Sequence, residues 1–128
     1  MEFIKYIEDS YGNHKYYDYK DAFSAGMCIL GDFLTDDVGN RPSSFREWLF
    51  DHSTSYASSN ATCLAKEGGY VLLSDLYSEE EDPTELKMTN AQFLKLLDDW
   101  EEKVIKVKPK EVVIKYENDK FVFETKNE

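Results

Sequence analysis

The chain contains little of what disulfide scaffolds, metal sites and membrane spans are built from. It has 2 cysteines, 2 histidines and 3 prolines in 128 residues, and no apolar run approaches the ~18 residues of a membrane-spanning helix. Cys28 and Cys63 lie 35 positions apart without a Cys-x-x-Cys motif, which predicts buried free thiols in a reducing cytosol. Residues 1–20 are too polar and acidic for a secretory signal peptide, so we expect a cytoplasmic protein.

Positive charge is also scarce. The sequence has 15 Lys and Arg against 26 Asp and Glu, which gives a formal net charge of −11. This excess disfavours direct binding to nucleic acid or to an anionic membrane, because their phosphates require a basic face. It favours a basic partner, and we expect that partner to be a protein.

Aromatic residues, by contrast, are abundant. They make up 15% of the chain, with 9 Tyr and 8 Phe, and are enough to fill a hydrophobic core. The length is that of one ordinary domain, whose folding buries roughly two-thirds of the unfolded surface. No internal repeat, low-complexity block or long linker divides the sequence, so residues 1–128 are predicted to form a single domain.

The first half of the chain predicts short elements. Residues 2–7 favour a strand, and residues 9–20 form either a loop or a second strand. The apolar run 26–34 fits a strand or a buried helix. A short helix is predicted near 43–50, capped by one of the serines at its start, and the Ser/Thr/Asn-rich residues 53–61 are predicted to be an exposed loop.

The second half carries stronger signals. A hairpin is predicted at about 62–76, because two apolar runs flank a Gly-Gly pair. After an acidic loop at 78–87, a capping box and apolar residues at three- and four-residue spacing predict an amphipathic helix over 89–106. Alternating residues predict a last hairpin at about 111–125. The fold class is therefore α+β, with a mainly antiparallel sheet packed by these two helices.

Catalytic and metal-binding motifs are missing from the sequence. His14 and the Asp51-His52-Ser53 run have no placed catalytic partners, since adjacent residues do not form triad geometry, and both histidines are expected to face solvent. Asp32, Asp36 and Asp37 do not follow a calcium-loop pattern. We therefore predict no catalytic residue, no metal and no cofactor. Acid–base chemistry by paired carboxylates remains an alternative.

One segment is strongly acidic. Residues 74–85 contain six acids and no bases. Such a segment is either a solvated loop or a docking strip for an electropositive partner. The polar face of the helix over 89–106 could extend the strip, and the candidate binding residues are Asp75, Glu79, Glu80, Glu81, Asp82, Asp98, Asp99 and Glu102. Of the two tryptophans, Trp100 is expected in the core, whereas Trp48 is either core or an exposed anchor.

Several segments resemble a known family of proteins. They are Asp36–Gly39, Pro42–Leu49, Tyr70–Leu76, Asp98–Glu101 and Lys108–Ile114, and they span about residues 36–116. Together they resemble the small acidic immunity proteins encoded with bacterial polymorphic toxins, including contact-dependent growth inhibition systems. The resemblance implies a non-catalytic, cytoplasmic inhibitor that binds the C-terminal domain of its cognate toxin, often a nuclease, and supplies no catalytic residues.

The predicted function is therefore neutralisation of a basic toxin domain, by blocking either its active site or the access of its substrate. Two alternatives come from other classes: a small enzyme that uses paired carboxylates, and an acidic adaptor that binds another basic protein.

Overall fold

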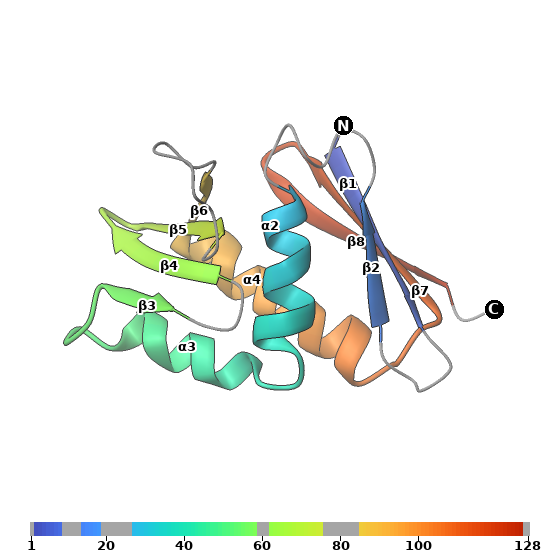
Figure 1. Ribbon diagram of the computed structural model, residues 1–128, viewed down its shortest axis with the longest axis horizontal. Helices are drawn as coiled ribbons and strands as arrows, with labels where there is room; N and C mark the ends of the chain where they lie inside the picture. The colour runs from blue at the N-terminus through green and yellow to red at the C-terminus, as the bar shows by residue number, and fades with distance from the viewer. Residues whose placement is uncertain (1, 9–13, 19–26, 59–61, 76–84, 127–128) are drawn as a thin grey trace.

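Two antiparallel sheets with helices between them form the part of the chain that the structure describes (Figure 1). The structure is a computed structural model that describes residues 2–8, 14–18, 27–58, 62–75 and 85–126, with side chains from Ile29 onward. The arrangement is α+β, as predicted. It contains two four-stranded sheets rather than the one sheet expected.

The first sheet joins the two ends of the sequence. Its strands, in spatial order, are β2 (His14–Asp18), β1 (Glu2–Glu8), β7 (Glu111–Glu117) and β8 (Lys120–Lys126). The predicted strand at 2–7 and the predicted C-terminal hairpin are confirmed. Within the segment 9–20, predicted as a loop or a second strand, residues 14–18 form strand β2, and the others lie outside the described residues. Asn118 and Asp119 make the hairpin turn with φ of 51° and 61°, a conformation that short polar side chains tolerate.

The second sheet is a meander. Its strands, in spatial and sequence order, are β3 (Tyr56–Ser58), β4 (Thr62–Glu67), β5 (Tyr70–Asp75) and β6 (Glu85–Thr89). The Gly68-Gly69 turn that joins β4 to β5 has φ of 56° and 86°, which only glycine adopts readily. This confirms the predicted hairpin at 62–76.

Two predicted loops are partly wrong. Residues 53–61 contain strand β3, and strand β6 begins at Glu85, inside the acidic loop expected at 78–87. Both strands lie at the edges of the second sheet. Their sequences are rich in Ser, Thr, Lys and Glu because an edge strand is partly solvated, so the apolar alternation that marks a strand is weak.

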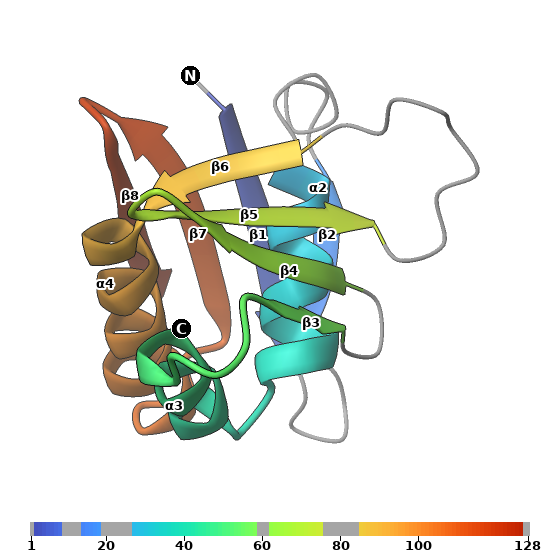
Figure 2. The same cartoon turned by 90° about the vertical axis from the view of Figure 1, so that its left-hand side faces the viewer.

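The described part of the chain has three helices, of which the first and third lie between the sheets and the second packs against the third (Figure 1). They are α2 (Met27–Asp32), which continues as the π-helical segment η1 (Phe33–Val38); α3 (Pro42–Phe50); and α4 (Asn90–Trp100), which continues as the π-helical segment η2 (Glu101–Ile105). The ambiguous run 26–34 is thus helical from Met27 onward. Helix α2 contacts β1 and β2 of one sheet and β5 and β6 of the other, while α4 contacts β5, β6 and β8 (Figures 1 and 2).

Helix α4 begins as its sequence predicts. The side-chain oxygen of Thr89 accepts a hydrogen bond from the Gln92 amide at 3.1 Å, and the Gln92 side chain accepts one from the Thr89 amide at 2.8 Å. This reciprocal capping box satisfies two amides that the first turn leaves without partners. Gln92 also donates to the carbonyl of Asp119 at 2.6 Å, which ties the start of α4 to the β7–β8 turn.

Helix α3 begins differently from the prediction. The expected serine cap is wrong, because Arg41 occupies the cap position without a side-chain hydrogen bond and Pro42 is the first helical residue. Proline is well suited to that position, since it has no amide hydrogen to satisfy and its φ is already helical.

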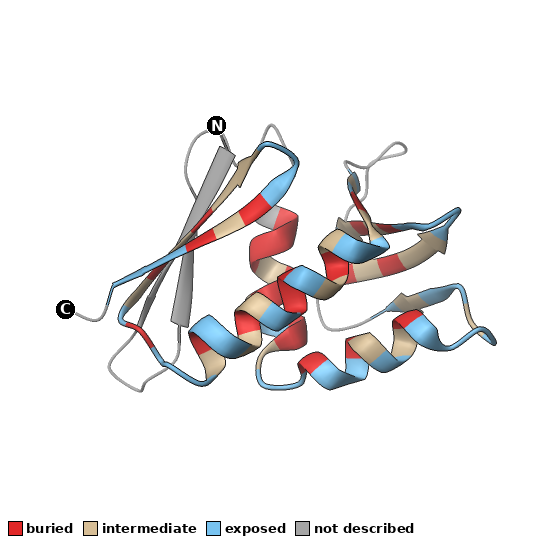
Figure 3. Cartoon of the chain, turned by 180° about the vertical axis from the view of Figure 1, so that it is seen from behind, coloured by how far each residue is buried: buried red, intermediate tan, exposed pale blue. Residues whose placement is uncertain are grey.

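The core lies where the helices meet both sheets, and Figure 3 shows buried residues recurring along α4. Trp100 is 3% exposed, which confirms its predicted core position. Its indole nitrogen donates to the carbonyl of Gly39 at 2.9 Å. Cys63 is a free thiol, as expected, but it is half-buried rather than buried, because it lies in β4 beside the edge strand, where the Tyr56 hydroxyl contacts its sulfur at 3.3 Å.

Candidate functional site

The candidate acidic residues fall into two separate groups. Strands β5 and β6 pair with Ser74 opposite Glu85 at one end and Tyr70 opposite Thr89 at the other. Asp75 therefore lies at the first end, whereas α4 starts directly after the second. Figure 2 shows α4 on one side of the second sheet and the end of β5 on the other. Asp75 and the acids of α4 and η2 therefore do not form one surface cluster.

The acidic segment begins and ends at the end of the sheet that carries Asp75. Asp75 and Glu85 are both exposed, and both belong to neighbouring strands. Glu79, Glu80, Glu81 and Asp82 lie outside the described residues, but the chain connects them to these two strand ends. We refer to the sequence segment 74–85 as the acidic end of the second sheet, because its two described ends, Asp75 and Glu85, lie there.

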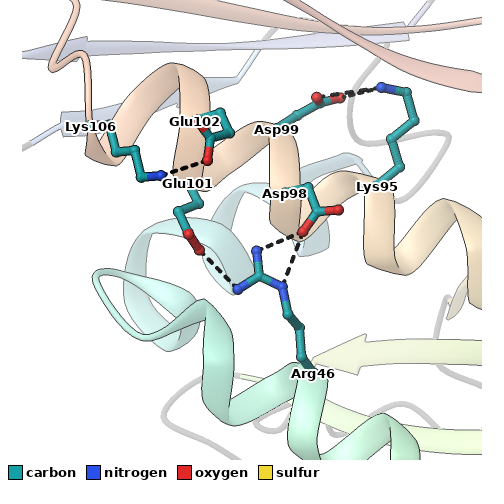
Figure 4. A network of polar contacts seen from close by, with 7 residues as sticks. All are labelled: Arg46, Lys95, Asp98, Asp99, Glu101, Glu102 and Lys106. Atoms are coloured by element: carbon teal, nitrogen blue, oxygen red, sulfur yellow. Dashed lines mark hydrogen bonds and ion pairs between the residues drawn. The ribbon is translucent and has the colours of Figure 1, made fainter.

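The acids of α4 and η2 are held by cations (Figure 4). Arg46 of α3 donates from Nε and Nη2 to one oxygen of Asp98, at 3.1 and 2.7 Å, and from Nη1 to Glu101 at 2.9 Å. Partial burial alone would lower the pKa of Arg46, but the hydrogen bonds to Glu101 and Asp98 outweigh it and raise the pKa above its ordinary value. This network joins α3 to α4.

Asp99 and Glu102 each have a lysine partner on the same helix. Lys95 contacts Asp99 at 3.1 Å and Lys106 contacts Glu102 at 2.7 Å, both four residues apart. The hydrogen bond to Glu102 raises the pKa of Lys106. Because each carboxylate has a nearby cation, the negative field of this face is largely cancelled. This face begins at the end of the β5–β6 pair opposite to Asp75, so the two described groups of acids are separate.

The Asp51-His52-Ser53 run forms a local turn. Asp51 accepts hydrogen bonds from the Ser53 hydroxyl at 2.6 Å and the Ser53 amide at 2.9 Å. These two hydrogen bonds lower the pKa of Asp51 below its ordinary range. His52 is exposed, and the serine hydroxyl is committed to the carboxylate rather than to the imidazole. The geometry is that of a side-chain-capped turn and not of a nucleophile activated by a base.

A pocket of about 240 Å³ lies between α3 and the edge strand β3. Its lining residues are Arg41, Ser44, Phe45, Trp48, Ala57 and Ser58. Sequence reasoning missed it, although Phe45 and Trp48 lie one helical turn apart and their spacing marks one face of α3. The half of the pocket that β3 contributes carries no sequence signal, because Ala57 and Ser58 are typical of a loop.

Trp48 forms one wall of this pocket and is firmly held. Its ring packs against that of Phe93, with the two ring centroids 6.2 Å apart. The amine of Lys66, a residue of β4, lies 4.7 Å from the centroid of the Trp48 ring. Lys66 also donates to the carbonyls of Trp48 at 2.6 Å and Asp51 at 2.8 Å, where the end of α3 leaves acceptors unsatisfied. Trp48 is half-buried, so neither of the two roles expected from the sequence describes it fully.

In the described ranges, no three His, Cys, Asp or Glu side chains are grouped so as to hold a metal ion. Nor do these ranges include a helix with the length and apolar character needed to cross a membrane.

Comparison with known proteins finds no matching family model, no similar curated protein and no similar solved structure.

Proposed function

We propose that the protein is a cytoplasmic, non-catalytic immunity protein that neutralises a basic bacterial toxin domain, such as a nuclease, by binding it. The observation that carries the proposal is the concentration of acidic charge at one end of the second sheet. Residues 74–85 hold six acids and no base. Two of the six, Asp75 and Glu85, are exposed on neighbouring strands and bracket the other four in the sequence.

The contrast with α4 supports this choice of surface. Asp98, Asp99 and Glu102 have cations at 2.7–3.1 Å, so a partner that approaches them meets a nearly neutral face. The acidic end has no basic residue in its own sequence. Summed carboxylate charge of this kind speeds the association of a basic partner and disfavours acidic competitors.

Inhibition follows from the chemistry of a nuclease cleft. Such a cleft is lined with cations that bind the phosphates of the substrate. Carboxylates of the acidic end would occupy the positions of those phosphates, and the body of the sheet would block access to the cleft. No chemical step is required of the inhibitor.

A protection assay tests the proposal. The gene next to the one for this chain is examined for a large secreted protein, and the C-terminal domain of that protein is expressed in a test bacterium with and without this chain. We expect growth arrest without the chain, recovery with it, and a one-to-one complex by size-exclusion chromatography. A toxic neighbouring domain that this chain neither binds nor neutralises would refute the proposal.

Two matched variants assign the protection to the acidic end. Glu80→Gln with Glu81→Gln removes two charges there, whereas Glu47→Gln with Glu67→Gln removes two exposed charges on α3 and β4. The first pair should weaken the complex and the second should leave it near wild type. Equal effects would mean that only net charge matters and that the acidic end is not the docking surface.

A further inference from the structure

The pocket between α3 and β3 carries an inference that stands apart from the acidic end. It is bounded by a helix on one side and by a sheet edge on the other, because β3 pairs with β4 alone among the strands that the structure describes. The pocket opens to solvent, and its volume of about 240 Å³ is many times that needed for one water molecule, so a side chain of a partner can enter it.

The lining is apolar at its base and positively charged at its rim. Phe45 is buried, and Trp48 is fixed by Phe93 and Lys66. These aromatic walls are preorganised, so filling the pocket requires little reordering of side chains. Arg41 is exposed and is the one charged residue in the lining.

Arg41 differs from the other arginine of the chain. Arg46 is held by Asp98 and Glu101, whereas no described residue forms an ion pair with Arg41. An arginine presents a planar set of donors that matches a carboxylate, and arginine and tryptophan are the residue types most enriched where binding energy concentrates. In a chain with a net charge of −11, this unpaired guanidinium at a pocket rim points to an acidic group in the ligand.

The free edge of β3 offers main-chain pairing next to the pocket. The Lys66 amide donates to the Ser55 carbonyl at 2.8 Å, and antiparallel pairing alternates, so the main-chain groups of Tyr56 and Ser58 point away from β4. The main-chain groups of Tyr56 already bond to Thr54, whose hydroxyl donates to the Tyr56 carbonyl at 2.8 Å and accepts from the Tyr56 amide at 3.4 Å. Pairing is therefore available at Ser58, which itself lines the pocket.

We propose that this pocket binds an extended segment of a partner protein, in which an apolar side chain enters between Phe45 and Trp48 and a carboxylate two residues away pairs with Arg41. The two-residue spacing follows from the strand, because side chains two positions apart project on the same face. The main chain of the segment pairs with Ser58, which a small molecule without a peptide backbone would not do.

Short peptides are the probes. Acetyl-Ser-Phe-Ser-Glu-Ser-amide and its reversed sequence present the required pair in both strand directions. The same peptides with Gln in place of Glu remove only the charge. Binding is followed by the two tryptophan indole signals in a ¹H–¹⁵N spectrum, since Trp48 lines the pocket and Trp100 is buried against the carbonyl of Gly39.

We expect a Glu peptide to shift the Trp48 signal and leave that of Trp100 in place. Replacing Glu by Gln in the peptide should weaken binding about five- to tenfold, the effect of one partly solvated charge-assisted hydrogen bond. Arg41→Gln should abolish that difference, whereas Lys110→Gln, which removes an exposed charge outside the lining, should preserve it. Ala57→Leu fills the pocket and should abolish the shift.

Three results would overturn the proposal. The first is an unmoved Trp48 signal at millimolar concentrations of every peptide. The second is equal affinity of the wild-type protein for the Glu and Gln peptides. The third is a shift of the Trp48 signal with protein concentration alone, which would mean that a second copy of the chain occupies the pocket. Arg41→Gln keeps the test decisive if Ala57→Leu fails to fold, because Arg41 is exposed.

Discussion

Arg46 on α3 donates two hydrogen bonds to a single carboxylate oxygen of Asp98 on α4, 52 residues further along the chain. The third contact of its guanidinium, to Glu101, spans the junction between α4 and η2. A cation that bridges two helices in this way stabilises their packing and also offsets the negative charge of two surface acids.

A double-mutant cycle on Arg46 and Asp98 measures that link. Asp98 is 62% exposed and Arg46 is 25% exposed, so solvent screens the pair and the coupling energy should be about 0.5–1 kcal/mol. Arg46→Met should lower the melting temperature by about 3–6 °C, because it also breaks the contact with Glu101. Urea unfolding of the two single variants and the double variant gives the coupling, and additivity would show that the ion pair contributes nothing.

The packing of Trp100 leads to a larger expected effect. Its side chain is 3% exposed and bonded to the carbonyl of Gly39, so Trp100→Ala should cost about 3–5 kcal/mol of unfolding free energy. Trp100→Phe keeps most of the apolar contact but removes the donor, and should cost about 1 kcal/mol beyond the lost volume. Denaturant unfolding tests both variants. A loss of less than about 1 kcal/mol for Trp100→Ala would contradict the packing of α4.

Elements with local signals were predictable from the sequence. Thr89 and Gln92 mark the start of α4 within one helical turn, and the Gly68-Gly69 pair marks the turn of the hairpin at 62–76. In each case the residues that determine the structure are neighbours in the sequence, so one short window contains the whole signal.

Features built from distant residues were not predictable. The pairing of β1 with β7 joins Ile4 to Ile114, and the ion pair of Arg46 with Asp98 joins two helices. In both cases the sequence around one residue does not indicate which distant residue it contacts. For the same reason the sequence allows the acids of α4 to extend the acidic segment, because it shows their charge but neither the cations that pair with them nor the end of the sheet at which Asp75 lies.

The run 26–34 was ambiguous for a different reason. Ile29, Leu30, Phe33 and Leu34 are all buried, because the helix that carries them lies between two sheets. A helix buried on more than one side loses the polar face that distinguishes its period from that of a strand.

Lys66 should stabilise the end of α3 more than an ordinary surface lysine. Lys66→Met removes the bonds to the carbonyls of Trp48 and Asp51 and the contact with the Trp48 ring, and should cost about 1–2 kcal/mol. The matched control is Lys87→Met. Lys87 lies 4.3 Å from the Tyr70 ring centroid but is exposed, and should cost about 0.5 kcal/mol or less. Equal melting temperatures for the two variants would mean that the carbonyl contacts add no stability.

The turn at Asp51 predicts a pH dependence with a definite sign. The hydrogen bonds from Ser53 lower the pKa of Asp51, so folding favours the charged carboxylate. Stability from this turn is therefore present above the unfolded-state pKa of ~3.9 and is lost as pH falls through the lower pKa of the folded state. Ser53→Ala removes the hydroxyl donor and should raise the pKa of Asp51 toward its ordinary value. Carboxyl NMR titration of both proteins measures this shift, and an unchanged pKa would exclude the hydroxyl as its cause.

The acidic end should control how fast the partner associates rather than how long it stays bound. Replacing Glu79, Glu80, Glu81 and Asp82 with Ser removes four charges from the acidic end. Steering depends on the summed field, so the association rate constant should fall, while the dissociation rate constant should stay closer to wild type. The measurement uses surface plasmon resonance or stopped flow with the toxin domain identified in the protection assay.

Salt separates steering from mere solubility. The Debye length shrinks from ~10 Å at 0.1 M to ~3 Å at 1 M, so the association rate of the wild-type protein should fall steeply with ionic strength. The variant should show a flatter dependence, because the field that salt screens has been removed. Circular dichroism and thermal unfolding check that the variant is folded. If both proteins have the same salt slope and the same rate constants at three ionic strengths, the segment serves solubility alone and these four acids do not steer the partner.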